Sequence, residues 1–284
     1  MILRRIRDSR ADAESVRAVA DAAFGRPPEQ DERRRVRFTR RVRHLAVTDP
    51  HGCWLAEDDA GRPVGAALAS RREGLWGLSL LAVVPGAQGK GVGGGLLRQA
   101  VAYARGTLRG MICARPHPGA ARLYRRAGFS LHPSMRMTGN VDRAGLVLPD
   151  GPAIEGGAAH RSLMDSVDRR LRGGAHGPDH EELLRHCRVV VADDLAGSGY
   201  AYVDDEGAVA LLAATSRRIA VRLLTSALLS LPAGSPATLR HLTAEQEWAL
   251  DVGLAAGLDL SADGYLCLRG MRPPSPYLPS AEYL

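Results

Sequence analysis

Three glycines at alternate positions follow an apolar run, and this order suggests a site for an anionic group. The run Leu78–Val84 has the length and content of a buried strand, and Pro85 ends it. The segment Gln88-Gly89-Lys90-Gly91-Val92-Gly93 comes next, and apolar residues at helical spacing follow it. Glycines allow tight turns, and a helix N-terminus offers unpaired N–H groups. The sequence therefore predicts a phosphate-binding loop between a strand and a helix.

Two common phosphate-binding loops fit this segment poorly. A Walker A loop needs Ser or Thr after its Gly-Lys pair to hold magnesium, whereas Gly91 follows Lys90. The dinucleotide pattern G-x-G-x-x-G is satisfied by Gly89, Gly91 and Gly94. However, its first glycine should lie at the strand end, and residues 85–88 intervene here.

A second segment, residues 121–129, reads ARLYRRAGF and predicts a short helix that contains Tyr124 and ends at Gly128. Together the two segments resemble the GNAT superfamily of acyl-CoA N-acyltransferases. One hallmark of that family is a Gln/Arg-x-x-Gly-x-Gly loop after a Val-x-Pro strand end; the other is a short helix with a tyrosine, closed by Gly-Phe. The loop matches in register at Val83, Pro85, Gln88, Gly91 and Gly93. The resemblance covers residues 1–140.

The resemblance implies direct transfer of an acetyl group from acetyl-CoA, as cosubstrate, to a primary amine, with no metal. The loop would hold the pyrophosphate, and the strand edge would pair with the pantetheine amide. Tyr124 would protonate the departing thiolate, because its ordinary pKa of about 10 keeps it protonated at neutral pH. A packed helix aromatic is the alternative for Tyr124. The residues expected to bind the cosubstrate are Leu81, Ala82, Val83, Gln88, Gly89, Lys90, Gly91, Val92, Gly93 and Gly94.

The general base is missing from the expected place. Many GNAT enzymes carry a glutamate on this strand, near the position of Gly77, but the run Leu78–Val84 has no carboxylate and Glu73 precedes it. An ordered water chain, a carboxylate from elsewhere or loss of activity would each account for the gap. Two functions therefore stay open: an N-acetyltransferase, for a small-molecule amine rather than a protein, and a noncatalytic acyl-CoA-binding or sensing protein.

The net charge of +7 does not indicate nucleic-acid binding. Of 38 basic residues only Lys90 is a lysine, a bias typical of GC-rich codon usage. One basic stripe, 33–44, has Phe38 and Val42 on one helical face. Its arginines predict either a solvated helix face or the rim of an acceptor pocket for an amine that also carries an anionic group.

Nothing in the sequence indicates a metal site, a disulfide or a membrane segment. The cysteines are widely spaced, and His176 and His180 are separated by Gly177 and Pro178, which argue against a shared helix face. The N-terminus lacks the apolar stretch of a signal peptide, and no apolar run reaches membrane-spanning length. We expect a cytoplasmic monomer or homodimer with reduced thiols.

The order of predicted elements in the first half of the chain returns in the second half. The sequence predicts an α+β fold with mixed α/β sheets, built as two tandem GNAT-like domains at 1–140 and 158–284, with a Gly- and Pro-rich linker at 141–157. An unrelated α/β domain with similar patterning is the alternative for the second half. In its predicted order, the second half has strands near 189–192, 199–203 and 209–213, a helix 217–231, a strand 238–240, a helix 244–256 and a strand 265–269.

The second half lacks the residues that carry the proposed chemistry. Aligning Leu96-Leu97 with Leu223-Leu224 pairs Gln88 with Thr215, Gly91 with Arg218 and Gly93 with Ala220. Aligning the closing Ala-Gly pairs of the two short helices sets Gly253 against Tyr124. We therefore expect this half to be noncatalytic and without a cofactor loop.

The last twelve residues, Pro273–Leu284, contain four prolines and two Tyr-Leu pairs. The prolines favour an extended path, and the apolar side chains predict docking against the protein body. The simpler expectation is that this tail covers an apolar patch. The alternative is that it brings a carboxylate, from Glu282 or Leu284, to the site whose strand has none, an arrangement that resembles some multidomain GNAT enzymes.

Overall fold

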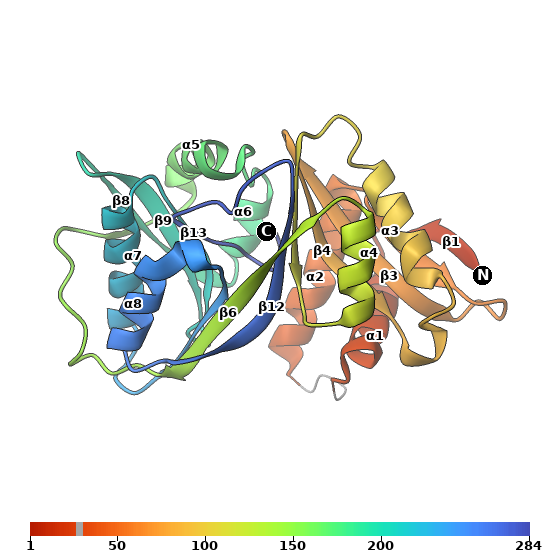
Figure 1. Cartoon of the computed structure of the whole chain (residues 1–284), viewed down its shortest axis with the longest axis horizontal. Helices are drawn as coiled ribbons and strands as arrows, with labels where there is room; N and C mark the ends of the chain where they lie inside the picture. The colour runs from red at the N-terminus through yellow and green to blue at the C-terminus, as the bar shows by residue number, and fades with distance from the viewer. Residues whose placement is uncertain (27–30) are drawn as a thin grey trace. The chain divides into compact units, whose positions relative to one another are not determined.

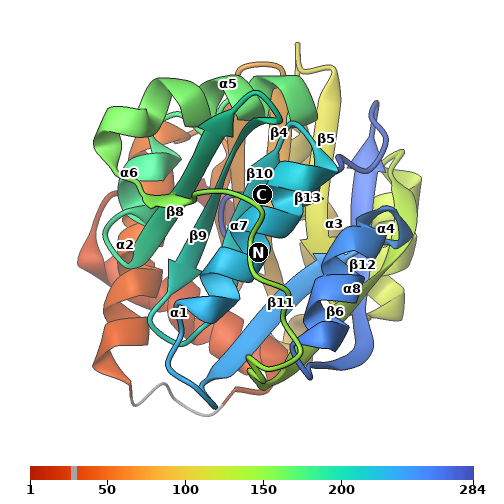
Figure 2. The ribbon, with the colours of Figure 1, turned by 90° about the vertical axis from the view of Figure 1, so that its left-hand side faces the viewer.

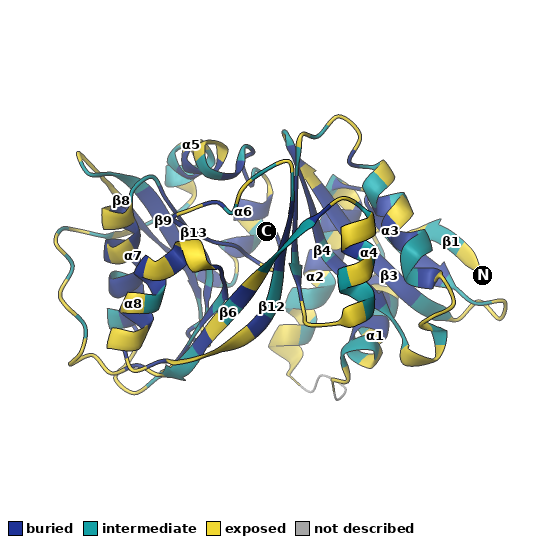
Figure 3. Ribbon diagram, in the orientation of Figure 1, coloured by how far each residue is buried: buried dark blue, intermediate teal, exposed yellow. Residues whose placement is uncertain are grey.

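The computed structural model describes residues 1–26 and 31–284 and divides the chain into two compact units (Figure 1). Unit 1 comprises Met1–Thr107 together with Leu284, and unit 2 comprises Leu108–Tyr283. Helices and sheets alternate in both, so the predicted mixed α/β class is confirmed. Buried residues concentrate on the strands and on one side of the helices (Figure 3). Among the described residues, no helix combines the length and the hydropathy needed to span a bilayer.

In its described residues, unit 1 has four antiparallel strands and three α-helices. Its strands pair in sequence order: β1 (Ile2–Arg5), β2 (Cys53–Glu57), β3 (Pro63–Arg72) and β4 (Leu75–Val83). Its helices are α1 (Arg10–Phe24), α2 (Glu32–Thr48) and α3 (Val92–Ala102). Helices α1 and α2 bury an apolar stripe on the sheet, with Val16, Val42 and Leu45 at most 1% exposed. This core supports β3 and β4, the strands nearest the predicted loop.

A buried ion pair joins α2, β3 and the residue that follows α3. Asp49 is fully buried and accepts hydrogen bonds from Arg72 Nη1 at 2.7 Å and from Arg71 N–H at 2.7 Å. The hydroxyl of Tyr103 donates a third bond at 3.0 Å. Because a carboxylate in an apolar interior is costly unless it is paired, these bonds fix where α3 ends relative to the sheet.

Unit 2 contains two sets of hydrogen-bonded strands. The first has the order β5-β12-β6-β11, with antiparallel neighbours: β5 (Arg109–Ala114), β12 (Asp259–Arg269), β6 (Ser130–Asn140) and β11 (Pro236–Leu242). The second is β13-β10-β9-β8-β7, also antiparallel: β13 (Tyr277–Leu278), β10 (Val209–Ala214), β9 (Gly197–Asp204), β8 (Cys187–Asp194) and β7 (Ile154–Glu155).

Five α-helices cover these sheets. They are α4 (Pro118–Arg126), α5 (Arg161–Arg172), α6 (Asp179–Leu183), α7 (Arg217–Leu229) and α8 (Glu247–Ala255). Helix α7 packs across β8, β9 and β10 (Figure 2), and its inward residues form one apolar core with α8 and β11. Leu223, Leu224 and Trp248 belong to this core. The predicted order of elements in the second half is confirmed.

The compact units do not follow the predicted boundaries at 140 and 158. Strand β12, near the end of the chain, lies between two strands of the first half: Cys267 pairs with Ile112 of β5 and with Leu131 of β6. These hydrogen-bonded ladders place residues 108–140 in the same unit as the second half. In the order β5-β12-β6-β11, the outer strands β5 and β11 occupy equivalent positions, and so do the inner strands β12 and β6. This symmetry is compatible with a repeat, whose domain boundaries stay a prediction.

Candidate functional site

Strand β4 contains a β-bulge just before the residues predicted to contact acetyl-CoA. Leu80 pairs with Leu68 and Leu78 pairs with Ala69, so Ser79 is an extra residue on β4. A bulge bends the strand and redirects its backbone groups, and bulges are frequent beside active sites. The predicted contacts Leu81, Ala82 and Val83 form the end of β4 beyond this bend.

The predicted loop lies between β4 and α3, as the sequence indicates. A turn at Pro85–Ala87 follows the strand, and Gln88 Nε2 donates to the Val83 carbonyl at 3.0 Å. Gly89 and Gly91 have φ values of 75° and 83°, in the left-handed region that favours glycine. Gly91 is the N-cap of α3. The N–H groups of the first helical turn therefore point out of the helix beside the exposed loop, where an anion is favoured.

The other predicted cosubstrate residues differ in what they offer. Lys90 is exposed, and Gly93 and Gly94 are in the first turn of α3. The Val92 side chain is 5% exposed and packs in the core, so only its backbone N–H faces the loop. Their role in binding stays a prediction.

Two contacts, one near each end, hold α3 close to the sheet. The Trp76 indole N–H donates to the Ala100 carbonyl at 3.0 Å, within the core. A Cβ at Gly65 of β3 would lie 2.9 Å from Leu96 Cδ1 and 3.0 Å from Val92 Cγ1, so α3 packs directly on this glycine. The position of the helix N-terminus is thus fixed by its packing.

Tyr124 lies in unit 2, on α4, and its side chain is 5% exposed. Burial, with a contribution from neighbouring Cys267, raises the pKa of this hydroxyl well above its ordinary value. The group is therefore a proton donor rather than a phenolate at neutral pH. The helix ends at Gly128, which has the predicted left-handed conformation with φ 86°. A role for Tyr124 as general acid stays a prediction.

The second half differs from the aligned loop more than the sequence suggests. Strand β10 ends at Ala214 and α7 begins at Arg217, so two residues connect them, whereas residues 84–91 connect β4 to α3. Arg218 and Ala220, which the alignment pairs with Gly91 and Gly93, lie inside α7. The pairing of individual loop residues is therefore wrong, because only residues 215–216 connect β10 to α7; this connection contains no glycine, as the sequence analysis expects. The hydroxyl of Ser216 caps α7 by accepting from Ile219 N–H at 3.3 Å.

The space beside Gly77 on β4 is occupied by the side chain of Leu284. A Cβ at Gly77 would lie 2.4 Å from Leu284 Cδ1 and 3.4 Å from Ser70 Oγ. Leu284 is fully buried. The position at which the family resemblance leads one to expect a glutamate is therefore packed against an aliphatic side chain. The catalytic role considered for a carboxylate of the tail stays a prediction.

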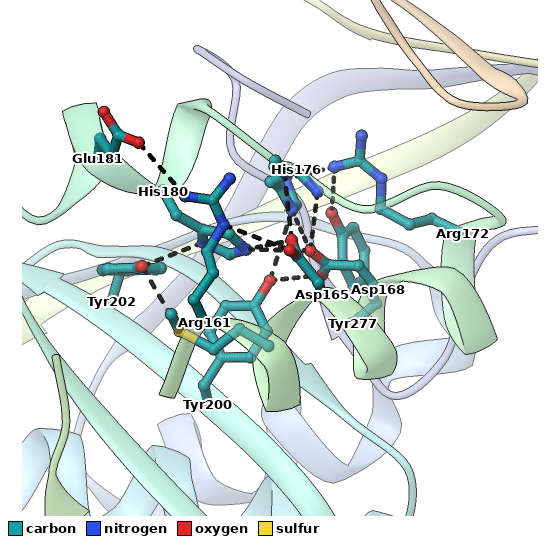
Figure 4. Close-up of polar contacts among 12 residues, drawn as sticks. Arg161, Asp165, Asp168, Arg172, His176, His180, Glu181, Tyr200, Tyr202 and Tyr277 are labelled. Carbon is teal, nitrogen blue, oxygen red and sulfur yellow. Dashed lines mark hydrogen bonds and ion pairs between the residues drawn. The ribbon is translucent and has the colours of Figure 1, made fainter. Parts of the chain in front are cut away.

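The structure also contains a buried polar network that the sequence analysis missed (Figure 4). His176 and His180 do not share a helix, as predicted, but both rings face Asp168. Asp168 Oδ2 is 2.7 Å from His176 Nδ1 and 3.3 Å from His180 Nε2. The hydroxyl of Tyr200 donates to Asp168 Oδ1 at 2.5 Å, and that of Tyr202 is 3.1 Å from His180 Nδ1. A signal that could have found the network is the spacing of Met164, Val167 and Asp168, which places an aspartate on the buried face of α5.

The ligand atoms of Asp168, His176 and His180 lie within 4.8 Å of one another, which is close enough to raise the question of a metal ion. The surrounding charges favour a hydrogen-bonded network instead. Arg172 Nη1 faces His176 Nε2, so this nitrogen is the acceptor and the proton is on Nδ1, directed at Asp168. A metal at Nδ1 would require a proton on Nε2, opposite the guanidinium. The donor set therefore fits a metal poorly.

The comparisons with known proteins agree with the loop and the fold. Residues 14–129 match the family model described as the acetyltransferase (GNAT) family. The sequence has no significant match among curated proteins. The solved structures show the fold at low identity.

Three of these structures each cover nearly the whole chain. The chain is similar to a protein from Pyrococcus horikoshii assigned as an acetyltransferase (TM-score 0.79, 17% identity, 99% of this chain and 95% of that one). It is similar to a tandem GNAT protein from the clavulanic acid biosynthesis pathway (TM-score 0.63, 12% identity, 95% and 99%). A GCN5-related N-acetyltransferase from Sphaerobacter thermophilus has a TM-score of 0.59 at 14% identity (94% and 95%).

The contact between Gly77 and Leu284 predicts a compensating pair of substitutions. Gly77→Ala should lower the free energy of unfolding by about 1–3 kcal/mol, because the new methyl group overpacks the core. In a Leu284→Ala background the same change should cost much less. Urea unfolding of the four chains gives the coupling. Gly86→Ala is the control, since a Cβ there meets nothing within 4 Å. Additive effects would contradict the contact.

Two buried histidines predict acid sensitivity. Burial and the Arg172 charge lower the pKa of His176, and burial lowers that of His241 from 6.5 to about 4. Between pH 6.5 and pH 4 the unfolded chain binds protons that the folded chain does not. The free energy of unfolding therefore falls as the pH decreases over this range. His241 alone contributes about 3 kcal/mol over this range. His241→Asn, which keeps the left-handed backbone accessible, should flatten the decrease in urea midpoint. An unchanged slope would exclude His241.

Proposed function

Since residues 14–129 match the family model of the acetyltransferase (GNAT) family, we propose that this chain transfers an acetyl group from acetyl-CoA to the primary amine of a small-molecule acceptor. The observation that carries the proposal is the glycine loop after β4, with Gly89 and Gly91 in the left-handed conformation and α3 beginning at once. This arrangement supports the binding of a pyrophosphate by backbone N–H groups.

The end of β4 is the proposed contact for the acyl-bearing arm of the cosubstrate. Backbone groups of Leu81, Ala82 and Val83 lie beyond the bulge at Ser79, where the strand direction changes. Amide groups of pantetheine have the same hydrogen-bonding pattern as a peptide, so they pair with such a strand end. A backbone N–H in this region would also stabilise the oxyanion that develops when the amine attacks the thioester.

Tyr124 is the proposed general acid. Its hydroxyl keeps its proton because burial raises its pKa, and donation to the leaving thiolate requires a protonated group. The acceptor amine must lose a proton before or during attack, and residues 75–83 contain no carboxylate to take it. Water or a group outside β4 would therefore take this proton.

A noncatalytic acyl-CoA-binding or sensing protein is the second candidate function. The packing of Leu284 against Gly77 favours it, because an aliphatic group fills the space beside the strand where a base would be expected. Release of free thiol in the presence of a panel of amines separates the two functions. Turnover with any amine supports the transferase, and binding without turnover across the panel supports the sensor.

A charged side chain in the loop should abolish binding of acetyl-CoA. We expect calorimetry to give one site per chain, and Gly91→Glu to remove it, because a carboxylate would meet the pyrophosphate and the residue must adopt φ 83°. Gly61→Glu is the matched control: it adds the same charge at an exposed glycine with φ 75°, in the turn between β2 and β3. Two sites in the wild type, or undiminished binding by Gly91→Glu, would contradict the proposed site.

Removing the Tyr124 hydroxyl should affect turnover rather than binding. Tyr124→Phe should reduce kcat by about 10²–10⁴-fold and leave the acetyl-CoA affinity unchanged, because the proton is needed only as the thiolate leaves. Tyr103→Phe, which loses a hydrogen bond to Asp49 instead, is the control for a lost hydroxyl. The measurement is thiol release with an amine from the panel. An unchanged kcat would remove Tyr124 from the mechanism.

A further inference from the structure

The tail of the chain adds a strand to the sheet of the second half. In β13, Tyr277 pairs with Ala213 and Leu278 pairs with Leu212 of β10. The Ala214 N–H donates to the Pro276 carbonyl at 3.3 Å and extends the ladder. At the other end of β10, a parallel bridge joins Ala208 to Thr238 of β11, and β13 contacts both β10 and β11. The tail therefore fills the space between two strands that separate.

The backbone groups that β13 covers correspond to those predicted to bind acyl-CoA. Strand β10 precedes α7 as β4 precedes α3. Counted back from the last residue of each strand, 212–214 correspond to 81–83, the segment predicted to pair with pantetheine. The tail thus takes, in the second half, the strand edge that the first half is proposed to offer to its cosubstrate.

A buried glutamine recognises the backbone of this tail. The Gln246 side chain is 2% exposed, its Nε2 donates to the Pro274 carbonyl at 2.8 Å, and its Oε1 accepts from the Tyr277 N–H at 3.1 Å. The Trp248 indole N–H also donates to Oε1, at 2.9 Å, and fixes the orientation of the amide. One side chain thereby binds a backbone acceptor and a backbone donor three residues apart, as a peptide-binding site does.

The buried polar network anchors the same segment through Tyr277. This side chain is 1% exposed, and Arg172 Nη1 donates to its hydroxyl at 3.3 Å. Figure 4 shows the Tyr277 hydroxyl directed at Arg172, close to His176 and Asp168. Through this hydrogen bond the network fixes the position of the tail strand.

We propose that residues 274–278 are a built-in occupant of the second half, standing where pantetheine would lie and closing this strand edge to acyl-CoA. The identity of the excluded ligand rests on the proposed function, whereas occupancy by the tail does not. Introducing a glycine loop between β10 and α7 would then be insufficient by itself to create a second acyl-CoA site.

Amide hydrogen exchange of the full chain tests occupancy. In the wild type, the amides of Tyr277 and Ala214, which donate to Gln246 Oε1 and to the Pro276 carbonyl, should be protected. Gln246→Met removes both tail hydrogen bonds at similar volume, and should speed exchange of these amides at least about tenfold while the far-UV circular dichroism is retained. Glu247→Gln, at the exposed next residue, is the matched control. Rapid exchange of these amides in the wild type, or no change in Gln246→Met, would overturn the proposal.

The same measurement with saturating acetyl-CoA tests the exclusion. Protection should increase at 81–83 and stay within twofold at 212–214 and at Tyr277, because that edge is already occupied. Increased protection at 212–214 with faster exchange of the tail would show displacement and overturn the inference. No change at 81–83 would count against the proposed function alone, and the exchange of Gln246→Met would still decide whether the tail is the occupant.

Discussion

The backbone N–H and C=O groups along the edge of a buried strand must find hydrogen-bond partners, and both halves of this protein depend on this constraint. A covered backbone N–H or C=O without a partner costs about 1–3 kcal/mol, so a strand that ends in the interior must find one. For β10 the partner is β13, from the same chain. For the end of β4, the proposed partner is the pantetheine of acetyl-CoA. The same kind of strand edge therefore binds a strand of the chain itself in the second half and, as we propose, a ligand in the first half.

The arrangement that holds the tail strand in unit 2 requires two charged side chains to be buried. Asp168 and Arg172 are both at most 1% exposed, and each would be strongly unfavourable alone. Desolvation by itself would raise the pKa of Asp168, but the neighbouring imidazoles and Arg172 outweigh it and hold the pKa below its usual range. The charges are therefore compensated only when α5, His176 and Tyr277 are in place together. This mutual dependence makes the tail part of the fold of unit 2.

Local signals in the sequence were sufficient for the loop and for the order of elements. Left-handed glycines, a strand-ending proline and an apolar helical repeat act within a few residues of one another, so Gly89, Gly91 and the start of α3 could be located without any partner. The same holds for the helix that contains Tyr124 and ends at Gly128. For these segments the conformational preference of each residue agrees with its tertiary context.

Tertiary structure alone decided which strands pair and which polar groups meet. The alternation of side chains shows which face of β12 is apolar, but not that it inserts between β5 and β6. Likewise the spacing of His176 and His180 indicated no shared helix, yet the chain brings both to Asp168. Pairing and burial depend on contacts between residues far apart in the sequence, and their free energy arises only when water is excluded from both partners at once.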